Sequence, residues 1–185
     1  MKINDPWLKP EESKNYSTLG FYIFSIADFE AKQVGSTECQ PCHLFLGILK
    51  VVDVDITTMD FTSLTLAQRD PILVSMLKET NILREIYERA KIDARILRKE
   101  YREKIRISDI PTETDGIMLK SSKSLNECVL EAESFSKGSH VRTFHMLKAL
   151  LQRKAMVRDE LLTKIGSSKA SFLKSIELET GAKLS

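Results

Sequence analysis

Apolar residues recur at three- and four-residue spacing along most of this chain, which is the pattern of amphipathic helices. The segments that show it are LGFYIFSIADFEAKQV (19–34), CHLFLGIL (42–49), ILREIYERAKIDARILRKEY (82–101), SLNECVLEAESFSK (124–137), FHMLKALL (144–151) and DELLTKIGSSKASFLKSIELE (159–179). Glycine and proline are scarce, so a loop-rich or disordered chain is not expected. The pattern predicts an all-α protein.

The helical segments form two copies of one arrangement. CHLFLGIL aligns with FHMLKALL, which places His43 on His145, and a Gly-Ser pair precedes each (35–36 and 138–139). Downstream, Ala90 aligns with Ile165, and Asp93 or one of Ser167 and Ser168 is suited to cap the next helix. Each copy therefore reads helix, glycine turn, helix, loop, helix, cap, helix. We predict about eight helices with pseudo-two-fold symmetry.

The alignment also shows where the copies differ. Lys148 stands opposite Leu46, Phe144 stands opposite Cys42, and Val141 falls near Cys39. Pro41 suits the first position of a helix and Thr143 suits a cap. The shared histidines are therefore interpreted as helix-start residues that pack between the repeats.

The stretch CQPCH (39–43) allows three chemical interpretations. It has the form of a c-type haem attachment site, but the second copy lacks both cysteines. A structural zinc site wants four ligands, and Cys128 is the only other cysteine. Cys39 and Cys42 also form a candidate redox pair, because a helix N-terminus lowers thiol pKa values. A thiol-redox or metal-responsive protein is the alternative function.

The ordered pair of repeats resembles the N-terminal domain of the Clp ATPases, a double repeat whose helices begin with an x-H-L-L-x-A-L-L-like motif. Here the motif appears as CHLFLGIL and FHMLKALL, and the L-L-x-x-x-G segment that follows appears as LLTKIG (161–166). The resemblance covers roughly residues 17 to 178. It implies a non-enzymatic interaction domain that binds an adaptor, a substrate protein or a Clp ATPase, and so modulates chaperone or protease activity.

Two departures qualify the resemblance. No G-x-x-x-x-G-K-[ST] loop is present, so the chain is either a stand-alone domain of this kind or part of a longer protein. In ClpC-like domains a glutamate precedes each histidine and helps to bind phosphoarginine, whereas Cys42 and Phe144 stand there in this chain. We expect no phosphoarginine recognition of that kind, because the carboxylate that pairs with the guanidinium is missing.

The first repeat carries an insertion at about 50–80. Its first part, VVDVDITTMDF (51–61), alternates as a half-buried strand does, and Asp70-Pro71 has the form of a cap and first residue of a short helix through Lys78. The insertion is either a decoration of the domain or a partner-binding element. Its apolar residues without a core role are the predicted protein-binding contacts: Val54, Ile56, Met59 and Phe61.

The remaining features limit the choice of function. Residues 84–106 hold nine basic and five acidic side chains, expected to form a solvated face with pairs such as Glu85–Arg89 and Glu100–Lys104 around a helix break near 91–93. No aromatic residues are interleaved there for stacking, and the net charge is only +2, so nucleic acid is not expected as a partner. No serine-hydrolase elbow or H-E-x-x-H motif occurs, so no catalytic residues, metal or cofactor are expected.

The domain organisation follows from the repeats. Residues 1–16 are predicted as an N-terminal extension and 17–180 as the double-repeat domain, with repeat one at 17–107 and repeat two at 117–180. No apolar run is long enough to span a bilayer, and the N-terminus lacks the core of a secretory signal. Together with three cysteines, an odd number, this favours a cytoplasmic protein with reduced thiols. The oligomeric state is left open.

Overall fold

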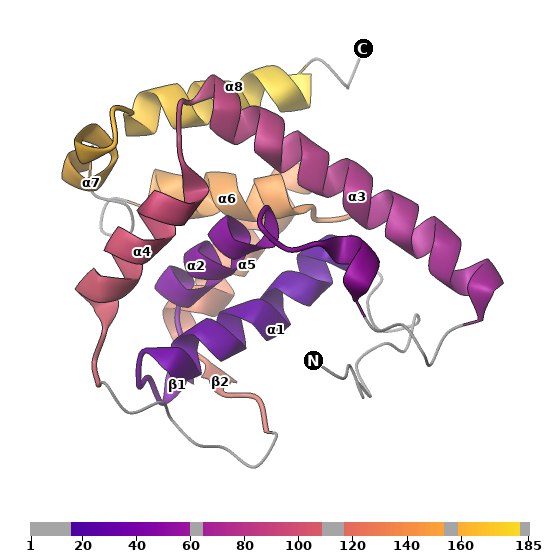
Figure 1. Cartoon of the computed structure of the whole chain (residues 1–185), viewed down its shortest axis with the longest axis horizontal. Helices are drawn as coiled ribbons and strands as arrows, with labels where there is room; N and C mark the ends of the chain where they lie inside the picture. Colours follow the sequence, from indigo (N-terminus) through magenta and orange to yellow (C-terminus); the bar gives the residue numbers. More distant parts are fainter. Residues whose placement is uncertain (1–15, 60–64, 109–116, 154–158, 182–185) are drawn as a thin grey trace.

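The chain folds into a helical assembly in which eight α-helices account for most of the described residues (Figure 1). The computed structural model describes residues 16–59, 65–108, 117–153 and 159–181. In chain order the elements are α1 (Thr18–Gln33), β1 (Glu38–Cys39), α2 (Pro41–Val51), the 3-10 turn η1 (Ile56–Thr58), α3 (Leu66–Arg89), α4 (Ala94–Ile105), β2 (Lys120–Ser121), α5 (Lys123–Ser136), α6 (Thr143–Gln152), α7 (Asp159–Lys164) and α8 (Lys169–Gly181). The predicted all-α class is confirmed.

The starts of the first helices show the symmetry of the two repeats. The hydroxyl of Ser17 accepts a hydrogen bond from the third residue of α1, and the hydroxyl of Ser122 does the same for α5. The N–H of Ser17 donates to the carbonyl of Val141, and the N–H of Ser122 donates to the carbonyl of Cys39, both at 2.9 Å. Cys39 and Val141 are thus equivalent. In each repeat, the segment before the second helix accepts a hydrogen bond from the residue that caps the first helix of the other repeat.

The junctions between the last two helices of each repeat also match. Lys91 and Gly166 both have positive φ, 56° and 79°, which ends α3 and α7 in the left-handed conformation. Asp93 then caps α4 through the N–H groups of residues 95 and 96, and Ser168 caps α8 through that of residue 171. The predicted break and both caps are confirmed. Of the two candidate serines Ser168 is the cap, because the hydroxyl of Ser167 donates to the carbonyl of Ala90.

Helix α2 is the centre of the core. Most of its side chains are apolar, and Leu44, Phe45, Leu46, Ile48 and Leu49 are fully buried between α1, α4 and the helices of the second repeat. Gly47 faces α1, where an added Cβ would lie 3.2 Å from the carbonyl oxygen of Ile23 and the backbone nitrogen of Ala27. The close contact of α1 and α2 therefore depends on a residue without a side chain.

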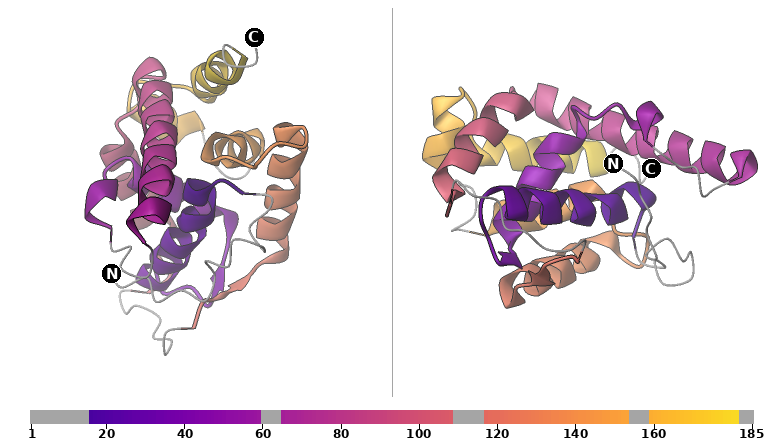
Figure 2. Two further views of the ribbon diagram at one scale, coloured as in Figure 1. Left: turned by 90° about the vertical axis from the view of Figure 1, so that its right-hand side faces the viewer. Right: turned by 60° about the horizontal axis from the view of Figure 1, so that its bottom comes forward.

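The insertion is helical, which corrects two predictions. The described part of the predicted strand, residues 51–59, is not a strand: α2 continues to Val51, and Asp55 caps η1 by accepting from Thr57. The helix does not begin at Pro71 but at Leu66, after Thr65 and Gln68 have capped each other. Pro71 therefore lies inside the helix at its sixth position, where it removes one hydrogen bond of the first two turns. Helix α3 is 24 residues long where its counterpart α7 has 6, and its N-terminal part projects beyond the helices beneath it (Figure 2).

Several charged side chains of residues 84–106 form ion pairs with other helices. Arg102 forms a two-pronged pair with Glu30 of α1, whose side chain is fully buried. Lys164 pairs with Glu100 at 2.6 Å, and Arg89 pairs with Glu179 at 3.1 Å. These cross-element pairs replace the predicted local ones, and the last two join the repeats. None of the helices within the described ranges is long and apolar enough to cross a membrane.

Candidate protein-interaction surface

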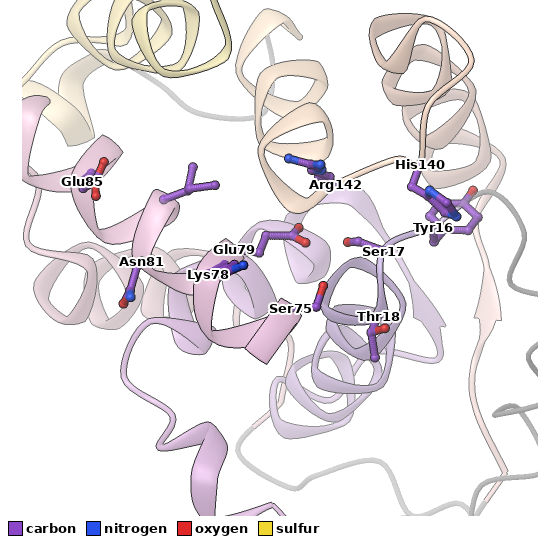
Figure 3. Close-up of a pocket in the computed structure, with 11 residues that line it drawn as sticks. Tyr16, Ser17, Thr18, Ser75, Lys78, Glu79, Asn81, Glu85, His140 and Arg142 are labelled. Atoms are coloured by element: carbon purple, nitrogen blue, oxygen red, sulfur yellow. The ribbon is translucent and has the colours of Figure 1, made fainter. Parts of the chain in front are cut away.

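A polar cleft lies between α3, the start of α1 and the segment before α6 (Figure 3). We call it the α3 cleft; it has a volume of about 570 Å³, and its lining includes Ser17, Ser75, Lys78, Glu79, Asn81 and Arg142. The α3 residues recur at helical spacing, so one face of the inserted helix forms a wall. The other walls are the start of α1 and the segment before α6. The cleft therefore exists only because the insertion lies over the junction of the repeats.

Glu79 fixes the insertion in this position. Its side chain is 5% exposed, and its Oε1 accepts a hydrogen bond from the N–H of Thr143 at 2.5 Å. A carboxylate at this place satisfies a free N–H group and lies at the positive end of the helix dipole. Thr143 is not the cap that the sequence predicted: it is the first residue of α6, and its buried hydroxyl has no partner among the described residues.

A second hollow adjoins the first and shares Ile82 and Arg142 with it. We call it the α6 groove; its volume is about 320 Å³, and its main walls are Phe135, Arg142, Phe144, His145, Lys148 and Ile176. Lys148 lies over the ring of Phe135, 4.9 Å from its centroid, and the guanidinium of Arg142 lies 5.9 Å from that of Phe144. The cleft and the groove meet at Ile82 and Arg142 and so form one track, polar at one end and aromatic at the other.

The two histidines have the same structural role, as predicted. Nδ1 of His43 accepts from the N–H of Gln40 at 3.0 Å, and Nδ1 of His145 accepts from the N–H of Arg142 at 3.1 Å. Burial lowers the pKa of each to about 4, and the cations Arg142 and Lys148 add to the effect on His145. Each ring is therefore neutral near pH 7, with its proton on Nε2. The histidines close the first turn of α2 and α6.

The cysteine motif does not have the properties of a reactive pair. All three cysteines are free, and burial raises the pKa of Cys39 to about 12 and that of Cys42 to about 11. This is opposite in direction to the effect expected from the helix start, because loss of solvation outweighs the dipole. In the parts of the chain that the structure describes, no three His, Cys, Asp or Glu side chains gather as a metal site requires. The raised pKa values of Cys39 and Cys42 disfavour the redox alternative.

The predicted contacts of the insertion are only partly at the surface. Ile56 is 1% exposed and belongs to the core, so it is unavailable to a partner. Val54 and Met59 are half-buried, and Met59 packs against the core. Phe61 lies outside the described residues. The surface that the insertion does offer is the polar face of α3, which sequence reasoning missed because it treated apolar residues as the contacts.

One signal for the second hollow was visible in the sequence. Lys148 interrupts the apolar pattern of its repeat, at the position where Leu46 is fully buried in the first repeat. A charged residue at a position that the repeat otherwise fills with leucine indicates a local opening in the packing.

The chain matches no protein-family model, and no curated protein matches it significantly. Its structure, however, is similar to the crystal structure of the Hsp104 N-terminal domain from Candida albicans, with a TM-score of 0.57. The match covers 88% of this chain and 89% of the other at 14% sequence identity. The fold is therefore that of a Clp N-terminal domain, with two four-helix repeats and an insertion in the first, as the paired histidine motifs predicted.

Proposed function

We propose that this chain is a non-enzymatic protein-interaction domain that binds an adaptor, a substrate protein or a Clp ATPase in the cytoplasm, and so modulates chaperone or protease activity. The domain comprises residues 17–180, and 1–16 are an extension to it. The observation that carries the proposal is the track formed by the α3 cleft and the α6 groove. It combines a polar rim with an aromatic floor, which is the composition of protein-binding sites.

The geometry supports a binding role better than a catalytic one. Several buried groups among the described residues that could act as acid or base are engaged in structural contacts: the histidines in helix caps, Glu30 with Arg102, and Glu79 with α6. The half-buried Val54 and Met59 extend the proposed surface at the base of the insertion as secondary contacts.

Site-specific photo-crosslinking in the native cell tests this proposal. A crosslinking residue placed at Asn81, in the α3 cleft, is compared with one at Lys99, an exposed position of α4 outside both hollows. We expect Asn81 to capture a small set of proteins that includes a Clp ATPase, its peptidase, an adaptor or a client, and Lys99 to capture none of them. The same proteins at both positions, or no capture at Asn81, would refute the proposal.

A further inference from the structure

The α6 groove differs from its symmetry-related place in the first repeat in a way that folding does not explain. In the first repeat the positions equivalent to Lys148, His145 and Ile176 are Leu46, His43 and Tyr101, and all three are buried. In the second repeat Lys148 replaces the leucine, His145 is only half-buried, and a hollow of about 320 Å³ is present. Since the first repeat packs with Leu46 at this position, packing does not require Lys148 and the hollow beside it, and a functional explanation is needed.

The opening is lined by cations held against aromatic rings. Lys148 stands 4.9 Å from the centroid of Phe135, and Arg142 stands 5.9 Å from that of Phe144. Lys137, which ends α5 in the left-handed conformation, adds a third positive charge to the rim. Such contacts hold long side chains in place and so reduce the entropy that a partner must remove to use them.

Little negative charge opposes these cations within the groove. Its carboxylate, Glu179, lies 3.1 Å from Arg89, so its charge is already compensated. Lys148 lies 4.0 Å from the carboxylate of Glu177, which is largely exposed to solvent. His145 responds to this field: burial first, and then Arg142 and Lys148, lower its pKa to about 4. The groove is therefore a positively charged site with an apolar floor.

We propose that the α6 groove anchors an acidic segment of a partner protein. An apolar side chain of that segment packs against the partly exposed ring of Phe135, and neighbouring carboxylates pair with Lys148, Arg142 and Lys137. This inference rests on the proposed function and specifies the chemistry of the partner. The volume of about 320 Å³ suits one or two apolar side chains. A single-stranded nucleic acid would also supply negative charge, and its bases stack on aromatic rings, so the test includes an oligonucleotide as the competing occupant.

Fluorescence anisotropy with synthetic peptides tests the inference on the purified chain. The probe is a peptide of about a dozen residues with phenylalanine and leucine among aspartates and glutamates. One matched peptide has the corresponding amides, and another has serine in place of the apolar residues. We expect the acidic peptide to bind about 10-fold more tightly than either, with an affinity that falls as salt is added. Equal binding of the amide peptide, or tighter binding of a single-stranded oligonucleotide, would overturn the inference.

Substitutions locate the binding to the groove. Lys148→Glu and Arg142→Glu should each weaken the acidic peptide by about 10-fold, whereas Lys99→Glu, the same charge change on α4, should leave it unchanged. Lys148→Leu restores the residue of the first repeat and should also weaken binding while keeping the fold, which circular dichroism checks. An equal effect of Lys99→Glu would show a non-specific charge effect and refute the site. If Asn81 captures the expected proteins in the cell but the peptides show no charge preference, this inference alone is refuted. If Asn81 captures none of those proteins, the proposed function is refuted.

Discussion

Glu79 is the residue through which the inserted helix is expected to stabilise the second repeat. It lies on α3, yet its carboxylate serves α6 across 64 positions of the sequence. Replacing it with alanine leaves the N–H of Thr143 buried without an acceptor, beside a threonine hydroxyl that already lacks one. The perturbation thus removes one interaction that joins the insertion to the repeat.

The magnitude follows from the type of bond. A buried hydrogen bond to a charged group contributes about 1.5–3 kcal/mol, and a carboxylate at a helix N-terminus adds about 0.3–1 kcal/mol. Glu79→Ala should therefore lower the free energy of unfolding by about 2–4 kcal/mol. Glu79→Gln keeps a neutral acceptor but loses the charge, so it should cost about half as much.

Urea denaturation followed by circular dichroism measures these values. Glu85→Ala is the matched control, because Glu85 lies on the same helix with its side chain exposed, and it should change the free energy by less than about 0.5 kcal/mol. The reasoning is refuted if Glu79→Ala and Glu85→Ala have equal effects, or if Gln is as costly as Ala.

Three further predictions concern other buried groups. The pKa of His43 is about 4 when folded and about 6.5 when unfolded, so only the unfolded chain takes up a proton between these values. His43 should therefore contribute about 2 kcal/mol to the fall in the free energy of unfolding from pH 7 to pH 5, beside a similar contribution from His145, and in urea titrations His43→Gln should make that fall about half as large. Cys39 and Cys42 should react with iodoacetamide at least about 100-fold more slowly in the folded chain than in urea, because burial keeps them protonated; equal rates would revive the redox alternative. Gly47→Ala should destabilise the chain by about 1–2 kcal/mol in thermal melts, since its Cβ meets the backbone of α1, and an unchanged melting temperature would contradict the close approach.

The sequence alone determined the architecture, because helix spacing, helix caps and the repeated motifs are all local features of the sequence. Apolar spacing specifies helices one by one, and the paired histidine motifs align the two halves. The cap residues Asp93 and Ser168 mark the breaks, since a side chain that satisfies free N–H groups acts within three residues of itself. These signals need no knowledge of distant contacts. For that reason the helix break, the caps and the class of fold were predictable.

Tertiary structure decided what long-range packing controls. Apolar and polar residues alternate at 51–61 with the period of a strand. In the structure, however, Ile56 lies in the turn η1 and is buried against the core, so its apolar character reflects this single contact and not one face of a strand. The pKa of Cys39 depends on the loss of water around it, which the CQPCH motif does not encode. Burial of a side chain by residues far along the chain has no local signature.

The candidate surface divides in the same way. Lys148 was a visible departure from its repeat, so the sequence marked a place where something differs. Only the packing of α5, α6 and α8 shows that this place is a groove with cations over Phe135 and Phe144. Likewise, nothing near Glu79 in the sequence indicates that it caps α6. Local composition fixes which helices form and where they end; which side chains face each other between helices is fixed by the packing of the whole chain.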